Sequence, residues 1–378
     1  MVNFDNAATT FPKPKVVVDS VAEALNYYGG NPGRSGHKLS LQTAEKIYET
    51  REKAASFFNA YPENVVFTLN CTHALNLAVK GVADDRGEII ISSLEHNSVA
   101  RPAVYKAKSE HNIAIAHVSD NDDETIKNIR KKITSKTRVI VFTLGSNVTG
   151  RITPYRRIGE LCAKNNICFI ADAAQAAGVI PIDIKKDNIN ILCCPGHKGL
   201  YGPPGTGMLI TDGKYPIKPI LQGGTGSESL SLHQPEYMPD ALESGTVNTS
   251  GIIGLGAGID FVTSLGLDNI YRHEFGLCER FLRKISQIAD VIVYMNINYG
   301  KYLPIVLFNI NGMKSSETAG VLSEKGFALR GGLHCSGLAH KSIGTAPNGA
   351  VRFSPSIFNS EKEVDDLTAA INDIINGR

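Results

Sequence analysis

The chain has 378 residues, of which 42% are hydrophobic and 20% are charged. This composition is typical of a folded globular protein with a sizeable core, and the length favours two or three domains. Lysine and arginine together number 39, and aspartate and glutamate number 37, for a formal net charge of +2. Because the charges balance, we expect no nucleic-acid partner and no binding to a charged membrane surface.

Targeting signals and cysteine spacing indicate the cellular compartment and whether a disulfide or metal site is expected. No apolar run approaches the roughly 18–20 residues that a membrane-spanning helix needs, and the first residues lack the pattern of a secretory signal. The seven cysteines are scattered without a CxxC pair, so neither a disulfide framework nor a structural zinc site is predicted. We therefore expect a cytoplasmic protein with reduced thiols and no metal.

The first two thirds of the chain predict alternating helices and strands. Apolar side chains recur at helical spacing over residues 40–59, and shorter helix-like stretches occupy 72–80 and 154–165. Apolar runs predict strands at 65–68, 88–92, 113–118, 138–143, 168–172, 189–194 and 207–210. Several of these strands are apolar on both faces, which predicts a largely parallel sheet covered by helices on both sides.

The pattern changes after residue 250. Two long helices are predicted at 251–266 and 267–289, a shorter one at 315–325, and strands at 291–294, 305–310, 327–330 and 350–353. Ser360 and Glu363 fit a capping box that opens the last helix. The predicted fold class is α/β, with a large domain over residues 15–250 and a smaller α+β domain over residues 1–14 and 251–378.

A lysine hemmed by glycines follows the strand predicted at 189–194. Lys198 lies between Gly196-His197 and Gly199, although lysines prefer solvated surfaces. A lysine in such a place can form a Schiff base with a carbonyl compound. A surface lysine in a glycine turn explains this segment alone equally well. A nucleotide-binding phosphate loop is excluded, because Met208 follows Gly207 where that motif needs a lysine.

Polar residues follow the carboxyl ends of at least four predicted strands: Thr72, His96, Asn147 and Asp172. Open α/β sheets bind ligands at this edge, so the convergence predicts a binding site. A buried carboxylate at residue 172 needs a cationic partner, such as a protonated pyridine nitrogen. Asp172 also suits a helix cap, and Thr72 suits either an anion site at a helix N-terminus or ordinary capping.

Cys335 lies beside His334 in a glycine-rich loop flanked by Arg330 and Arg352. Cationic neighbours favour a thiolate, and the glycines would let the loop move. The alternative is a free cysteine in a surface loop. The other six cysteines lie mostly in apolar runs or helices, and we expect them in the core.

Together these segments resemble the cysteine desulfurase family, within the class V aminotransferase-like branch of fold-type I pyridoxal phosphate (PLP) enzymes. The resemblance covers essentially the whole chain and includes residues 4–10, 31–37 and 243–248. The Arg-x-Gly-x-His-Cys pattern of residues 330–335 resembles the branch with a short cysteine loop, which includes selenocysteine lyases. Cys71, His73 and Pro195 depart from the usual residues near the cofactor phosphate, which predicts weaker cofactor binding.

The resemblance implies roles for the cofactor site. Lys198 binds PLP as a Schiff base, Asp172 pairs with the pyridine nitrogen, Gln175 contacts the ring hydroxyl and His96 stacks on the ring. The residues implied at the phosphate are Cys71, Thr72, His197 and, from the other subunit of a homodimer, Thr246.

The resemblance also implies the substrate side of the site. Asn147 and Arg352 hold the substrate carboxylate, Ala7 and Arg330 also contact the substrate, and Cys335 accepts the sulfur. The implied reaction converts L-cysteine to L-alanine and leaves a persulfide on Cys335 for a protein sulfur acceptor.

Alternatives remain open at this point. They are a selenocysteine lyase, a cysteine lyase that releases sulfide, another class V aminotransferase-like enzyme, and a scaffold that keeps the fold without chemistry. The presence of Lys198, Asp172 and Cys335 disfavours the scaffold.

Overall fold

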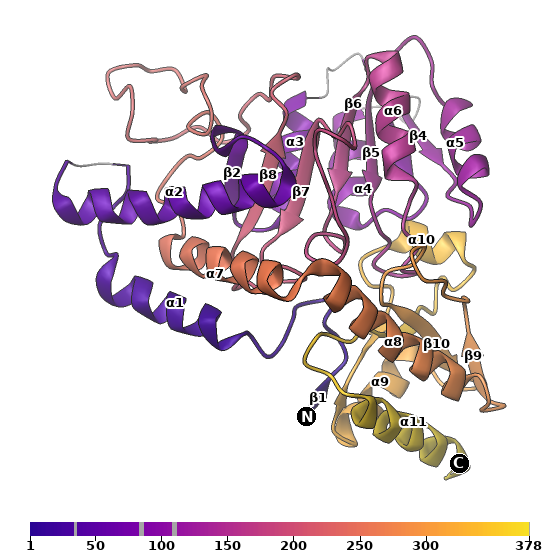
Figure 1. Ribbon diagram of the computed structural model, residues 1–378. Coiled ribbons are helices and arrows are strands. Elements are labelled where there is room, and N and C mark those ends of the chain that lie inside the picture. The colour runs from indigo at the N-terminus through magenta and orange to yellow at the C-terminus, as the bar shows by residue number, and fades with distance from the viewer. Residues whose placement is uncertain (34–35, 83–86, 108–111, 378) are drawn as a thin grey trace.

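A seven-stranded sheet forms the centre of the large α/β part of the protein (Figure 1). The computed structural model describes residues 1–33, 36–82, 87–107 and 112–377. The strand order is β2-β8-β7-β6-β5-β3-β4, and β3 to β7 run parallel to one another, whereas β8 is antiparallel to both of its neighbours. The predicted, largely parallel sheet is therefore confirmed. The bounds are β2 (Val65–Thr68), β3 (Glu88–Ser92), β4 (Ile113–Ala116), β5 (Thr137–Thr143), β6 (Cys168–Asp172), β7 (Ile191–Pro195) and β8 (Gly207–Thr211).

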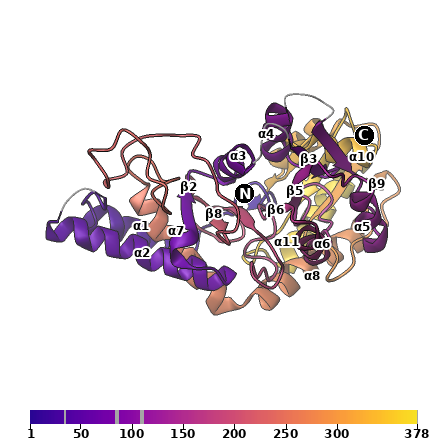
Figure 2. The same ribbon diagram turned by 90° about the horizontal axis from the view of Figure 1, so that it is seen from above.

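Helices cover both faces of this sheet, because successive strand residues are buried in two separate cores. Ile140 and Phe169 contribute to one core, and Val139 and Ile170 to the other. Figure 2 shows α3 and α4 on one side, with α2, α6 and α7 on the other. The bounds are α1 (Lys15–Tyr27), α2 (Lys38–Phe58), α3 (Cys71–Val82), α4 (Asn97–Ala107), α5 (Asp122–Arg130), α6 (Tyr155–Asn165) and α7 (Thr249–Leu265).

The C-terminal third builds a smaller antiparallel sheet with the order β12-β13-β10-β9. The final helix begins with the predicted capping box of Ser360 and Glu363. The bounds of these elements are α8 (Leu267–Ile285), β9 (Val291–Val293), β10 (Val306–Ile310), α9 (Ser315–Glu324), β12 (Arg330–Gly332), α10 (Gly337–Ser342), β13 (Ala350–Phe353) and α11 (Glu361–Asn376).

The prediction of a single strand at 327–330 is wrong, because residues on either side of Leu329 pair with two different strands. Phe327 in β11 (Phe327–Ala328) pairs with Val2 in β1 (Val2–Asn3), whereas Arg330 in β12 pairs with Arg352. The N-terminus thereby joins the smaller part of the protein.

Hydropathy alone does not identify a membrane span in the described ranges. No single helix there is long and apolar enough, and α7 with α8 qualifies only as a pair bent by 81°.

Candidate active site

A pocket at the carboxyl ends of β5, β6 and β7 has an empty volume of about 490 Å³. Strand pairing explains why it forms there: Thr143 is level with Asp172, and Asp172 with Cys193, so three strands end at one edge. The predicted site residues that line it are Cys71, Thr72, His96, Asn147, Asp172, Gln175, His197 and Lys198.

Lys198 follows the end of β7, is partly buried and borders two pockets. Burial, with help from the Arg352 guanidinium, lowers the pKa of Lys198 to about 8, although Cys71 and Asp172 act in the opposite direction. About a tenth of the amine is therefore uncharged and nucleophilic at pH 7, far more than for an ordinary lysine. This environment separates Lys198 from an ordinary surface lysine.

Asp172 ends β6 and is only 2% exposed. Its Oδ1 accepts a hydrogen bond from the Ala174 backbone N–H at 2.8 Å and from the Cys71 thiol at 3.6 Å. Burial raises the pKa of this carboxyl, whereas the Ala174 bond and the Lys198 charge act against the rise. None of the described residues donates a hydrogen bond to Oδ2, which leaves that atom available to a cationic ligand.

The N-terminus of α3 faces the same pocket. Asn70 caps this helix, since its Oδ1 accepts from the His73 N–H at 2.9 Å. The Thr72 side chain is exposed in the pocket and takes no part in that cap. The Nδ1 of His197 is buried without a partner among the described residues. A helix N-terminus, a free hydroxyl and an orphaned imidazole nitrogen together fit a phosphate group.

His96 and His197 are both held in the neutral form. Burial, together with the nearby Lys198 charge, lowers the pKa of each imidazole to about 4. The Nδ1 of His96 lies 2.8 Å from the Ser98 hydroxyl. Gln175 donates from Nε2 to the Ala7 carbonyl at 3.0 Å, and Ala7 lines a second pocket that Lys198 also borders.

Arg352 lies in the middle of β13 and is 1% exposed. One terminal nitrogen donates to the Asn147 carbonyl at 3.0 Å, and the other pairs with Asp5 at 2.6 Å. Its Nε is buried and has no partner among the described residues. The guanidinium therefore still has a donor for an anionic ligand. Asp5 was not identified from the sequence, although it lies inside the segment 4–10 that carried the resemblance.

Cys335 is exposed on its loop, whereas all the other cysteines are buried, as predicted. His334 and Cys335 adopt left-handed backbone angles, with φ of 50° and 54°. Arg330 donates to the Cys335 sulfur at 3.6 Å. The loop is anchored to the start of α4, because Asn97 donates its backbone N–H to the Cys335 carbonyl at 2.8 Å.

The Asn147 amide contacts this loop. Its Nδ2 donates to the His334 carbonyl at 3.0 Å, and its Oδ1 accepts from the Ser336 hydroxyl at 2.7 Å. The amide expected to hold a substrate carboxylate thus also holds the segment that carries Cys335.

Two further buried groups were missed by sequence reasoning. Glu95 accepts from the Ser92 hydroxyl at 2.5 Å and from the Thr143 N–H at 2.8 Å, so it joins the ends of β3 and β5. Burial, with the nearby Asp172, raises its pKa to about 8. His340 lies beside His334, with its Nε2 3.1 Å from the Nδ1 of His334 and the two rings nearly coplanar. The position of Glu95 directly before His96 was the available signal, and His340 offered none beyond its place in the loop.

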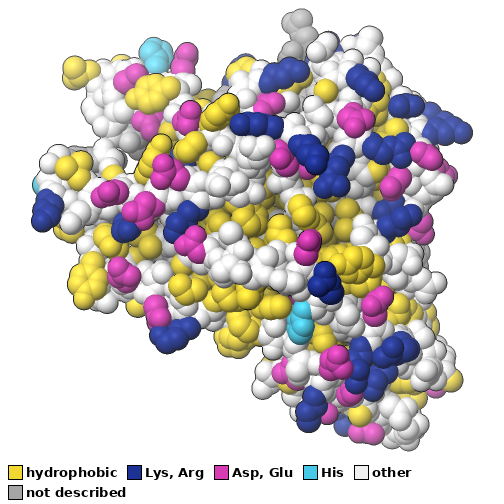
Figure 3. Space-filling view, in the orientation of Figure 1, with side chains coloured by type: hydrophobic (Ala, Val, Ile, Leu, Met, Phe, Trp, Pro, Cys, Tyr) yellow, Lys and Arg dark blue, Asp and Glu magenta, His cyan; other side chains and the backbone are white. Residues whose placement is uncertain are grey.

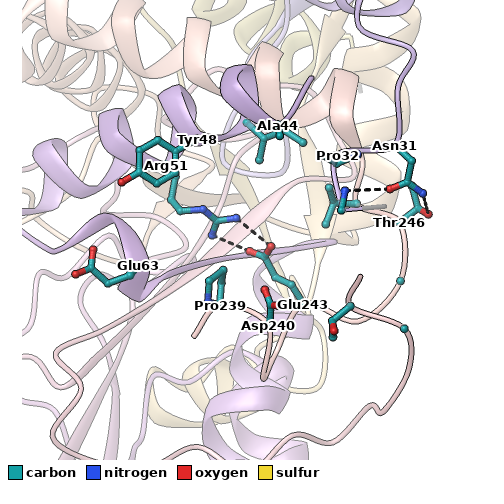
Figure 4. A pocket seen from close by; sticks show the side chains of 16 residues that line it. Asn31, Pro32, Ala44, Tyr48, Arg51, Glu63, Pro239, Asp240, Glu243 and Thr246 are labelled. Atoms are coloured by element: carbon teal, nitrogen blue, oxygen red, sulfur yellow. Dashed lines mark hydrogen bonds and ion pairs between the residues drawn. The ribbon is translucent and has the colours of Figure 1, made fainter. Parts of the chain in front are cut away.

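Thr246 is not in the Lys198 pocket. It lines a separate pocket, where it accepts a hydrogen bond from Asn31 at 3.3 Å (Figure 4). Arg51 and Glu243 point toward each other in the same pocket and form a buried ion pair at 2.9 Å. Arg34 and Ser35, within the segment 31–37, lie outside the described residues.

Comparison with known proteins identifies the family. The family model for aminotransferase class V matches residues 2–367. Proteins named "Probable cysteine desulfurase" from Methanothermobacter thermautotrophicus and Borreliella burgdorferi are 30% and 32% identical, over 98% and 99% of this chain and 94% and 92% of theirs. The apo structure of a cysteine desulfurase from Thermococcus onnurineus NA1 matches with a TM-score of 0.92 and 31% identity, over 100% of this chain and 95% of that one. The chain therefore belongs to the class V aminotransferase family and, within it, to the cysteine desulfurase family of PLP-dependent enzymes.

Proposed function

We propose that this protein converts L-cysteine to L-alanine with PLP and receives the sulfur on Cys335. One observation carries the proposal. Asn147 lines the pocket of Lys198, and its side chain bonds both neighbours of the exposed Cys335. The loop that carries the nucleophilic thiol is therefore bonded directly to a residue that lines the pocket of the candidate cofactor lysine.

The residues of the pocket fit PLP, which when bound supplies an electron sink for the substrate. Lys198 is the covalent anchor, and Asp172 Oδ2 is the acceptor for the ring nitrogen. The Cys71 thiol contacts Asp172, so we assign it to the ring-nitrogen end rather than to the phosphate. The phosphate end is formed by Thr72 and His197, while His96 and Gln175 flank the ring.

The substrate carboxylate binds at Arg352, whose buried Nε has no partner among the described residues. Asn147 and Arg330 are the other polar residues that contact the substrate. Ala7, whose carbonyl accepts a hydrogen bond from Gln175, borders the substrate as well. With its pKa lowered to about 8, Lys198 exchanges a proton with the substrate α-carbon.

Cys335 performs the sulfur transfer. Arg330, 3.6 Å from the sulfur, stabilises negative charge on it. The thiolate attacks the substrate sulfur, so that an S–S bond forms as the Cβ–S bond breaks. The electron pair left on the β-carbon takes up a proton to give alanine, and Cys335 keeps the persulfide for a protein sulfur acceptor.

The proposal includes a homodimer in which Thr246 reaches the partner's phosphate site. Two observations support this part. Thr246 and Asn31 lie in a pocket of their own, away from Lys198. Apolar side chains also gather over α1 and α7 (Figure 3), and Leu230 and Leu232 in the loop before α7 are fully exposed. Symmetric pairing would cover such surfaces. Light scattering of the purified protein tests the dimer, and a monomer would contradict it.

The cytoplasm is the compartment we propose, because all seven cysteines carry free thiols and a reducing environment keeps them so.

The decisive experiment measures alanine from L-cysteine plus a reductant, for PLP-loaded wild type and Cys335→Ala. We expect alanine from the wild type alone. Alanine from both proteins would contradict the role of Cys335, because the reductant would then take the sulfur directly. A lyase that eliminates sulfide would form pyruvate and ammonia instead of alanine. Alanine from neither, with turnover of selenocysteine, would favour a selenocysteine lyase.

A further inference from the structure

The N-terminal segment 5–13 contacts three parts of the candidate site: Arg352, Gln175 and the backbone of His197. Asp5 pairs with Arg352 at 2.6 Å, and the Ala7 carbonyl accepts from Gln175 at 3.0 Å. A segment that precedes the first helix therefore joins groups on the small and large sheets.

Several hydrogen bonds from this segment meet at one atom, the carbonyl oxygen of the peptide bond between His197 and Lys198. The carbonyl of His197 accepts from the Thr10 backbone N–H at 3.2 Å, from the hydroxyls of Thr9 and Thr10 at 3.2 and 3.1 Å, and from the Lys13 ammonium at 2.9 Å. A carbonyl oxygen has two lone pairs, so four donors crowd it. Of these donors, the charged Lys13 makes the strongest bond.

No carboxylate in the described part of the chain balances the charge of Lys13. Its remaining hydrogen bond goes to the Thr10 hydroxyl at 2.8 Å, and no acidic side chain among the described residues forms an ion pair with it. Burial lowers the pKa of this half-buried amine to about 8. A partly buried cation without an acidic partner lowers the stability of the fold. Residues that are unfavourable for stability in this way concentrate at functional sites.

The charge also reaches the pocket. Lys13 adds to the effects of burial and of Lys198 that keep the His197 imidazole neutral. One cation thus fixes the backbone of the candidate cofactor lysine and acts on the imidazole at the candidate phosphate end.

We propose that Lys13 is a positioning residue that holds the His197–Lys198 peptide in the geometry needed for covalent attachment of the cofactor. This inference rests on the proposed function, since it takes Lys198 to be the cofactor lysine.

Lys15 supplies a matched control. It lies two residues further along, is exposed, and pairs at 2.6 Å with Asp19 on its own helix. Lys13→Met and Lys15→Met therefore remove the same charge and differ in the contact to His197. Lys13→Gln keeps a hydrogen-bond donor and provides a second variant should Lys13→Met fold poorly.

The test measures PLP affinity of the apoproteins and the pH titration of the absorbance band of the Lys198–PLP linkage. We expect roughly tenfold weaker PLP binding for Lys13→Met, as for loss of one charge-assisted hydrogen bond. We also expect a titration midpoint moved upward, because a nearby cation is gone, with Lys13→Gln moving it likewise. Lys15→Met should match the wild type.

Two outcomes separate this inference from the proposed function. Equal PLP affinity and equal titration in Lys13→Met and Lys15→Met, even with a lower melting temperature, would show a merely structural lysine. Absence of the absorbance band in the wild type and in Lys15→Met would contradict the proposed function itself, and the inference with it.

Discussion

Asn147 holds Cys335 from both sides. Its amide nitrogen donates to the carbonyl of the preceding residue at 3.0 Å, and its oxygen accepts from the hydroxyl of the following residue at 2.7 Å. The loop was expected to move because of its glycines, but in this structure the residues beside the thiol are buried and bonded. A ligand that draws the Asn147 amide toward Arg352 would therefore loosen the cysteine loop.

Asn147→Ala should free the loop. We expect iodoacetamide to alkylate Cys335 several-fold faster in this variant, because both flanking residues lose a hydrogen bond, and we expect alanine formation to fall. Asn269→Ala is the control, since that amide bonds only the Leu265 carbonyl on an exposed helix end. Unchanged alkylation in Asn147→Ala would show that the Asn97 contact alone holds the thiol in place.

Lys198 should destabilise the protein when no cofactor is bound. Its pKa of about 8 lies below the usual 10.5, so between these values the unfolded chain binds more protons and stability rises with pH. Lys198→Met removes this penalty, and urea unfolding of the apoproteins at pH 7 should show a gain of about 3 kcal/mol. The gain should shrink above pH 8 and vanish near 10.5. A variant less stable than wild type at pH 7 would contradict this view of the lysine.

His340 should support the cysteine loop through a fixed chain of protons. The Arg330 carbonyl only accepts, so the Nε2 of His334, 3.0 Å away, carries its proton. The Nδ1 of His334 then accepts from His340 at 3.1 Å, and the Nδ1 of His340 accepts from Thr345 at 2.7 Å. Burial lowers the pKa values of the two imidazoles to about 3 and 4, so both stay neutral at physiological pH.

His340→Phe breaks this chain and leaves the Nδ1 of His334 without a donor. We expect alanine formation to fall roughly tenfold, with PLP binding unchanged. The exposed neighbour Lys341 provides the control variant Lys341→Ala. Wild-type alanine formation in His340→Phe would refute a role for this chain in holding Cys335.

Arg51 and Glu243 should matter for stability far more than a surface pair on the same helix. Their side chains are only 8% and 10% exposed, and Glu243 also accepts from the Phe67 N–H at 2.6 Å. Arg51→Met leaves a buried carboxylate unpaired, so we expect a loss of about 3–5 kcal/mol in urea unfolding. Lys53→Met, which removes the exposed pair with Asp260, should cost about 0–1 kcal/mol. Similar losses of unfolding free energy in Arg51→Met and Lys53→Met would show that burial does not make the Arg51–Glu243 pair more important than an exposed one.

Strands buried on both faces were the most predictable part of the fold. The strands at 65–68, 88–92, 168–172 and 350–353 begin and end where their apolar runs predict. Helices with irregular sequences were harder: α4 contains Pro102, which local patterns treat as a break. The strand predicted at 327–330 failed because its residues pair with two different strands, and a one-dimensional pattern carries no information about pairing partners.

The sequence by itself indicated the residues that we propose to carry the chemistry. Lys198 and Asp172 stood out because a lysine and a carboxylate at or just after the ends of buried strands cost more than they would at the surface. Cys335 stood out because it lies beside a histidine in a glycine-rich loop flanked by arginines. Only the tertiary structure decided how they are held. Asp5 meets Arg352 across 347 positions, Asn147 meets His334 across 187, and Lys13 meets His197 across 184. Such hydrogen bonds depend on where separately formed elements pack, to within a few tenths of an ångström, and periodicity along the chain does not encode that distance.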